Sequence, residues 1–551
     1  MKKNIYTIII TIIVITGVSC KKSFLDRVPS DYISENEVFN NINNAEGFVN
    51  NFYVNIGSWN YGSGVSYVTS AMTDESKQRW ANGAILFNTA AWNPSNFSPI
   101  SLDWTQGYAI IRSINTFLAN YDKVPEDPND PDRRTRLKGE ALMLRAYYHF
   151  VLFRGWGKIP LLAKPLAPAT DGDAVFLERS DLPVVIAFIN KDLDDAMALL
   201  PEKHSSNALW GRGTKTICMA IKSRMSLFYA SALFNPNNDI TRWQTAATLS
   251  KQALDMALAN GYTLTPKYAD AFLTYAPTEC IWGRNMGDGG GGGATAIDQV
   301  MQPLGYSGYT NCGPIQDLVD EYEMKTGVAI NAVGSGWDPK HPYKNRDPRF
   351  YASILYPGAK WKNRTINIYT NDKDNASEPG TNYWWKKFMT ESLVLPGNTG
   401  GSNKTWTIFR TGELMLNYAE AQNEAVGPDA TVYSAINAIR TRAGMPNISP
   451  GLTQSQMRTA IRHERRIELV FEGHRFWDVR RWKIAEIVDN KPVFGVNYTL
   501  SPTNATDTTF TYFQAQNRVF DASKHYFMPV PQSEMDKLTG KNPGFTQTPG
   551  W

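Results

Sequence analysis

Apolar residues recur at helical spacing through two long blocks of the chain. In the first block they fall three or four positions apart, the period of one buried face of an α-helix. Residues 180–183 join a capping side chain to an early proline, as at a helix start, and Pro201 follows the expected end. The block predicts amphipathic helices over residues 104–121, 137–152, 182–200, 215–233 and 243–260.

The second block predicts helical segments over residues 413–424, 432–442 and 454–487. Long segments without helical spacing cover residues 57–103, 279–313, 327–403 and 492–551, and they are rich in Trp, Tyr, Asn and Gly. We find no linker rich in Pro, Ser or charge that would divide the chain. The pattern predicts one mainly α unit with paired helices, a large irregular region and few short strands. A strict repeat of about 34 residues is missing, so the spacing by itself supports tetratricopeptide-like packing only weakly.

Residues 461–483 pack acids, bases and aromatics into one run. Helical geometry places Glu464, Glu468 and Glu472 on one face. Two interpretations follow: a catalytic or metal-binding face, or an internal ion-pair network with the arginines of the same run. Residues 463–467 come close to the zinc-protease spacing His-Glu-x-x-His, but Ile467 occupies the fifth place and cannot bind a metal. We favour the ion-pair network, and we expect no metal and no cofactor.

The first 20 residues are typical of a secretory signal. Lys2 and Lys3 precede an apolar run, and small residues lead to Cys20. The apolar run is too short to cross a hydrocarbon core of about 30 Å. A cysteine after small residues resembles a lipoprotein cleavage site, with Cys20 lipidated as the first mature residue. The alternative is an ordinary signal peptide with an incidental cysteine. We expect a soluble body tethered by lipid.

Composition narrows the choice of partners. The net charge of +4 is small for 551 residues, and no dense run of Lys and Arg occurs, so we expect no nucleic-acid partner. Aromatic residues make up 12% of the chain, with 16 Trp and 26 Tyr. Some of this surplus belongs in the core. A surplus of flat rings also suits a sugar-binding surface, because a ring stacks on the apolar face of a pyranose.

Several short motifs, in a fixed order, resemble those of the SusD/RagB family of nutrient-binding outer-membrane lipoproteins. The run at residues 461–483 resembles the C-terminal signature of this family. The other matching segments are 138–148 (KGEALMLRAYY), 155–161 (GWGKIPL), 316–324 (QDLVDEYEM), 346–350 (RDPRF), 409–410, 418–421 and 542–545 (NPGF). Together they span nearly the whole mature chain.

The resemblance implies a signal peptide at residues 1–20 and one unit at residues 21–551. Within that unit it implies an N-terminal helical-repeat part at 21–278 and a C-terminal part at 279–551, with tetratricopeptide-like helix pairs. It further implies a lipid-anchored protein at the outer face of the outer membrane. The implied partner is a TonB-dependent transporter of the SusC type.

The resemblance also implies where a ligand binds. Family members place a ligand-facing tryptophan and polar neighbours in the first large loop, which points to Trp80 and Trp92. Their expected polar companions are Asp74, Arg79, Asn82 and Asn93. Tyr306 and Tyr309 resemble a second aromatic contribution to the binding surface. The alternative for each tryptophan is that it fixes the loop onto the helices.

Three functions remain open. The leading hypothesis is a binding protein that captures an oligosaccharide and passes it to the transporter. The second keeps the scaffold and binds peptides, as RagB-like relatives do. The third is a surface hydrolase that uses acids such as Glu464 or Asp478, although a glycosidase needs two carboxylates about 5–9.5 Å apart across one cleft. The aromatic content favours the glycan.

Overall fold

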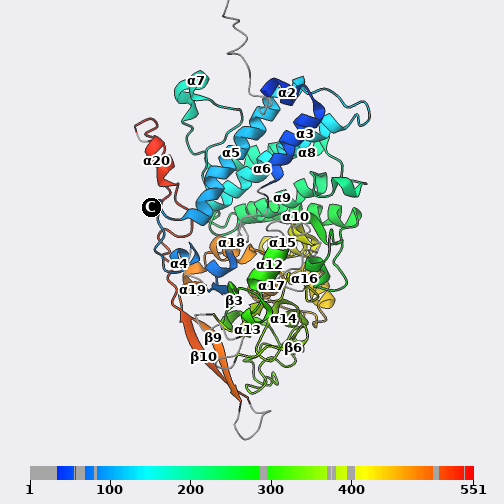
Figure 1. Cartoon of the computed structure of the whole chain (residues 1–551), viewed down its shortest axis with the longest axis vertical. Helices are drawn as coiled ribbons and strands as arrows, with labels where there is room; N and C mark the ends of the chain where they lie inside the picture. The colour runs from blue at the N-terminus through cyan, green and yellow to red at the C-terminus, as the bar shows by residue number, and fades with distance from the viewer. Residues whose placement is uncertain are drawn as a thin grey trace, which may run out of the picture.

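The computed structural model describes residues 34–54, 56, 69–79, 83–285, 294–368, 374, 380–393, 404–500, 508–538 and 540–551. Figure 1 shows helices gathered in its upper half and shorter elements joined by long connections in its lower half. The mainly α prediction is confirmed. Trp80, Asn82 and Cys20 lie outside the described residues.

The N-terminal half of the chain forms a series of packed helices. They are α2 (Glu35–Phe39), α3 (Ile42–Asn50), α4 (Gly83–Asn88), α5 (Ser98–Asn120), α6 (Arg133–Trp156), α7 (Pro168–Asp171), α8 (Leu182–Leu199), α9 (Lys215–Ala230), α10 (Ile240–Ala259) and α11 (Asp270–Leu273). The five longest, α5, α6, α8, α9 and α10, agree with the helical spacing of the sequence. Each packs on the next, and α6 is buried along most of its length between α5 and α8.

Local capping sets the helix starts. The Thr214 side chain accepts a hydrogen bond from the Ile217 N–H at the start of α9, at 3.2 Å. Asp239 does the same for the Thr241 N–H at the start of α10, at 3.0 Å. Such bonds satisfy N–H groups that have no partner inside the helix.

The C-terminal half adds helices that pack back onto the first half. They are α12 (Ala294–Met301), α13 (Gln316–Glu321), α14 (Pro348–Ser353), α15 (Thr411–Val426), α16 (Ala430–Arg442), α17 (Gln454–Glu468), α18 (His474–Arg481), α19 (Ala485–Val488) and α20 (Gln532–Leu538). Helix α15 packs against α10, so the two halves share one interior.

The helical segment expected at residues 454–487 is divided into the three helices α17, α18 and α19. Helix α17 ends at Glu468, and Phe471 and Gly473 take positive φ angles of 62° and 83°. Two left-handed residues turn the chain before α18, so Glu472 does not continue the helical face of Glu464 and Glu468. Gly473 is the signal for this turn in the sequence.

The described strands form small two-stranded antiparallel sheets. Four of these sheets join β1 (Ser76–Gln78) to β3 (Cys312–Pro314), β2 (Cys280–Asn285) to β8 (Thr405–Arg410), β4 (Ile354–Leu355) to β7 (Trp384–Trp385), and β5 (Lys360–Trp361) to β6 (Arg364–Thr365). The fifth is the hairpin of β9 (Val493–Leu500) and β10 (Thr508–Gln516), which extends towards the lower end of Figure 1. Residues 492–551, expected to be irregular, therefore hold this hairpin and α20.

Candidate functional site

The two segments that carry the predicted ligand contacts lie side by side. Strand β1 pairs with β3, which brings residues 76–78 against 312–314. The ladder continues beyond both strands, because the Arg79 N–H donates to the Asn311 carbonyl at 2.7 Å. The Gln78 side chain also donates to the Asn311 side chain, at 3.3 Å. Residues that are far apart in the sequence thus form one surface.

Tyr309 and Arg79 are the centre of this surface. The Tyr309 side chain is 43% exposed. The Arg79 guanidinium donates to the Tyr309 carbonyl at 3.3 Å, and the Gln299 amide donates to the Tyr309 hydroxyl at 2.9 Å. The Gln299 bond holds the hydroxyl end of the ring and the Arg79 bond holds the Tyr309 backbone, while part of the residue stays open to solvent. A fixed, exposed ring beside a guanidinium can stack on a sugar and donate to its hydroxyls.

Tyr306 lies half-buried in the turn that precedes Tyr309. The Arg364 guanidinium sits 4.0 Å from the centre of its ring, and the Tyr306 hydroxyl donates to the Arg364 carbonyl at 3.3 Å. Arg364 is held in turn by Asp374 at 2.7 Å. Burial raises the pKa of Tyr306 to about 12, although the Arg364 charge opposes the shift. Arg364 covers one face of the Tyr306 ring, so a ligand can stack only on the other face.

Trp92 is part of the interior. Its side chain is buried, and its ring stacks on Phe87 at 4.5 Å and on His525 at 4.7 Å between ring centres. Trp551 closes a third side, at 4.6 Å. The prediction that Trp92 faces a ligand is wrong, because these rings together fix residues 89–97 onto the C-terminal segment. The alternative interpretation of this tryptophan holds.

Asp74 is also buried and fully engaged. Its two carboxylate oxygens accept from Arg475 at 2.8 and 2.7 Å, and Arg466 adds a contact at 3.0 Å. Burial raises the pKa of Asp74, but the charges of Arg466 and Arg475 outweigh it and hold the pKa well below its usual range. The prediction of a ligand contact is wrong here too, since a buried carboxylate needs cationic partners and has taken them.

Asn93 is exposed, but its side chain already serves the backbone. The Asn93 side-chain oxygen accepts from the Ser95 N–H at 2.9 Å, and the Asn93 N–H donates to the Asn96 side chain at 2.6 Å. This asparagine turn leads into α5. The side-chain NH₂ group of Asn93 remains the part that a ligand can reach.

Sequence reasoning missed the residues that position the site. Gln78 holds the Asn311 side chain, and Gln299 holds the Tyr309 hydroxyl. Neither glutamine lies in a recognisable motif. The partner of Gln78 is 233 positions away. No local pattern records such a pairing, so only the β1–β3 register could have revealed it.

The acids of the 461–483 run belong to an internal ion-pair network. Glu468 contacts Arg349 at 3.1 Å, Arg410 at 2.8 Å and also Arg442. Glu472 binds Arg410 and Lys387, each at 2.7 Å. These contacts confirm the prediction of an internal ion-pair network.

The acids of that network were expected to pair with arginines of the same run, and this part of the prediction is only partly met. Glu464 pairs with Arg349 and Arg440, which lie outside the run. The arginines of the run bind other acids, as Arg481 does with Glu420 at 2.5 Å. Side chains on one helix face point towards a neighbouring element, so their partners come from that element.

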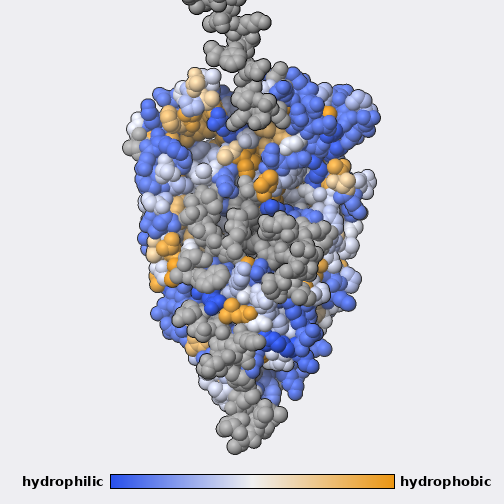
Figure 2. All heavy atoms as spheres, in the orientation of Figure 1, coloured by the Kyte–Doolittle hydropathy of each residue, from blue (hydrophilic) through white to orange (hydrophobic). Residues whose placement is uncertain are grey.

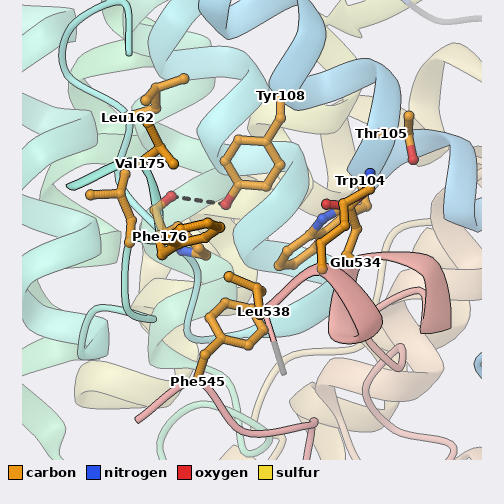
Figure 3. A pocket seen from close by; sticks show the side chains of 12 residues that line it. Trp104, Thr105, Tyr108, Leu162, Val175, Phe176, Glu534, Leu538 and Phe545 are labelled. Atoms are coloured by element: carbon orange, nitrogen blue, oxygen red, sulfur yellow. Dashed lines mark hydrogen bonds and ion pairs between the residues drawn. The ribbon is translucent and has the colours of Figure 1, made fainter. Parts of the chain in front are cut away.

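An apolar cavity of about 310 Å³ lies elsewhere, where α5, α20 and residues 160–177 meet (Figure 3). Trp104, Phe176, Leu538 and Phe545 line it. The Tyr108 hydroxyl points to the Pro160 carbonyl and donates to it at 2.8 Å. Other polar groups of its wall are Thr105 and the ion pair of Glu534 and Lys537 at 2.7 Å.

The outer surface is mixed in character. Figure 2 shows hydrophilic residues over much of this face and hydrophobic residues in small separate patches. Within the described ranges, no helix has both the length and the apolar composition that a membrane span requires.

Comparison with known proteins places the chain in a family. The model described as "SusD family" matches residues 278–551, and the model described as "Starch-binding associating with outer membrane" matches residues 23–227. SusD-like protein P2 of Formosa agariphila is 26% identical over 465 residues, which cover 81% of each chain. SusD-like protein P38 of the same organism is 25% identical, over 72% of this chain and 75% of its own length.

Solved structures share the fold. A SusD-like protein from Bacteroides fragilis superposes with a TM-score of 0.77 at 23% identity, covering 95% of this chain and 100% of its own. A structure named a laminarin-binding SusD-like protein gives 0.66 at 22% identity, covering 92% and 99%. The order of motifs, the fold and these matches agree: the chain belongs to the SusD/RagB family.

Proposed function

We propose that this protein is a cell-surface glycan-binding lipoprotein that captures an oligosaccharide and delivers it to a TonB-dependent transporter of the SusC type. The observation that carries the proposal is the placement of exposed Tyr309 beside Arg79 on the β1–β3 surface. The names of similar proteins agree, since one family model is described as starch-binding and a similar structure as laminarin-binding.

The geometry suits binding without bond cleavage. A flat ring contributes apolar contact area, and a guanidinium donates several hydrogen bonds in a fixed arrangement. The Arg79 contact and the Gln299 bond hold Tyr309 before any ligand arrives, so little side-chain freedom is lost on binding. Trp80 and Asn82 lie one and three positions after Arg79 in the sequence, and we propose that they complete this surface.

The acids considered for hydrolysis are engaged elsewhere. Glu464 and Asp478 are buried, and they pair with Arg349 and Arg481 respectively. An acid in such a pair cannot reach a glycosidic bond at the surface. This supports a protein that leaves its cargo intact.

Membrane attachment and delivery are further parts of the proposal. A lipid on Cys20 would hold the chain at the outer membrane, facing the exterior, in line with the description "associating with outer membrane" of the matching model. Residues 21–278 and 279–551 would act as one unit. The packing of α10 on α15 and the pairing of β2 with β8 support this, because they join segments distant in the sequence.

The test is direct binding by isothermal titration calorimetry. The purified protein is titrated with laminarihexaose, maltohexaose and a uronic-acid hexasaccharide, beside Trp80→Ala and Tyr309→Ala variants. We expect binding of a glycan, and a loss of affinity of about tenfold or more in each variant. Affinity that is unchanged in both variants rejects this surface. A peptide pool that binds while every glycan fails would assign the scaffold to peptides.

A further inference from the structure

A groove on the helical side of the molecule has the features of a second binding site. Two cavities, of about 320 Å³ and 170 Å³, share the loop Trp210–Arg212 as a common wall. Tyr53, Tyr275, Arg284 and Asn285 line the larger cavity. Lys203 and Tyr262 line the smaller one. The larger volume alone is in the range of small-ligand pockets, about 300–1,000 Å³.

Two aromatic rings form the centre of this groove. The rings of Trp210 and Tyr275 lie 5.3 Å apart between centres, tilted by 50°. Tyr275 is 39% exposed. Within the described part of the chain, neither the Trp210 indole N–H nor the Tyr275 hydroxyl has a hydrogen-bond partner. Each ring thus presents an apolar face together with an unused polar group.

The wall beneath Trp210 is fixed by a dense set of bonds. The Gly211 carbonyl accepts from the Trp282 indole at 2.9 Å. Arg212 donates to Glu140 at 2.9 and 2.8 Å and contacts Glu46 at 3.0 Å. Gly211 has a φ of +85°, a conformation that favours glycine. The loop is therefore set before a ligand arrives, which lowers the entropic cost of binding.

Polar and cationic groups flank the two rings. Arg284 is exposed beside the larger cavity, and one of its N–H groups donates to the Val54 carbonyl at 3.0 Å. In the smaller cavity the Lys203 ammonium lies 4.6 Å from the centre of the Tyr262 ring. A chain of pyranose units in this groove would meet both aromatic rings and hydrogen-bond donors.

We propose that this groove is a second oligosaccharide-binding site, with one sugar ring on Trp210 and Tyr275 and the next units running towards Tyr262. The inference rests on the proposed function, since it assumes a glycan ligand. It is distinct from the Tyr309 surface, because neither Tyr309 nor Arg79 lines either cavity. The paired rings favour a sugar over the backbone of a peptide, because a pyranose offers a flat apolar face on which a ring can stack.

The experiment counts sites by isothermal titration calorimetry on the purified protein. The probes are laminarihexaose, maltohexaose and the uronic-acid hexasaccharide. We expect two bound chains per protein for the cognate glycan. Tyr275→Ala and Trp210→Ala should each weaken one of these sites by about tenfold or more and leave the other unchanged. The matched control is Tyr512→Ala, since Tyr512 is 46% exposed on the β10 strand. A thermal melt of each variant confirms that it is folded.

Other outcomes overturn the inference in distinguishable ways. A single site that is lost in Tyr309→Ala and unchanged in Tyr275→Ala and Trp210→Ala rejects the groove and keeps the proposed function. Competition by peptides for the Tyr275-dependent site rejects its assignment to sugars. Absence of binding to every glycan, with peptides bound instead, rejects the proposed function and the groove together.

Discussion

Asp74 and Arg475, 401 positions apart in the sequence, form a two-bond ion pair at 2.8 and 2.7 Å in the protein interior. The pair joins the segment that enters β1 to helix α18. It thereby fixes the base of the surface on which Arg79 and Tyr309 lie.

Removing the charge of Asp74 should destabilise the whole fold. The Asp74→Asn variant leaves Arg475 buried without its anion and leaves Arg466 with Glu321 alone, and loss of a buried partner of this kind costs about 3–5 kcal/mol. Differential scanning calorimetry should show a clearly lower Tm. The control is Asp255→Asn, since the Lys251–Asp255 pair is exposed and worth less than about 1 kcal/mol. Equal effects in the two variants would contradict this account.

Stability should fall in acid partly through Glu468. Burial raises the pKa of Glu468, but Arg442, Arg410 and Arg349 outweigh it and hold the pKa below its ordinary value of 4.5. Because the folded pKa is the lower one, the stabilisation is present above pH 4.5 and is lost as the pH falls towards the folded pKa.

The Glu468→Gln variant isolates this contribution. We expect its Tm to be lower than that of the unaltered protein at pH 7 and to decline less between pH 5 and pH 3. Thermal melts across this range provide the measurement. Parallel curves for the two proteins would show that Glu468 does not contribute to the acid sensitivity.

Trp92 and Tyr309 should respond in opposite ways to truncation. Trp92→Ala removes a buried ring that stacks on Phe87 and His525, so it should cost about 3–5 kcal/mol of stability. Tyr309→Ala should leave the Tm nearly unchanged and weaken glycan binding by about tenfold. Melting curves and titrations on both variants decide this. A stable Trp92→Ala protein with impaired binding would restore the original expectation for Trp92.

Gly308 allows a close approach that positions Tyr309. A Cβ at this residue would lie 2.2 Å from the Gln302 carbonyl oxygen, and backbone cannot yield as a flexible side chain does. Gly308→Ala should therefore displace the turn at residues 303–311 and reduce glycan affinity. The matched control is Gly47→Ala, since Gly47 lies within α3 without a positive φ and no atom lies within 4 Å of the added carbon. Titration of both variants with the same hexasaccharide provides the comparison.

Helix positions were largely readable from the sequence. The spacing within residues 104–121 and 137–152 marks α5 and α6 because a helix must bury one stripe of side chains. Residues 180–183, with their early proline, mark the start of α8 as well. The expected helix ran through the turn at Phe471, because one glycine, Gly473, is the single conventional turn residue there.

The candidate site, like the fold, was predicted from the sequence only in part. The sequence by itself determined the helical scaffold and, through its ordered motifs, the family, because local spacing and motif order are written along the chain. Only the tertiary structure decided that Asp74 and Trp92 are buried while Tyr309 is exposed. The reason is physical: exposure depends on partners such as Arg475 and His525, which lie hundreds of positions away and leave no local trace.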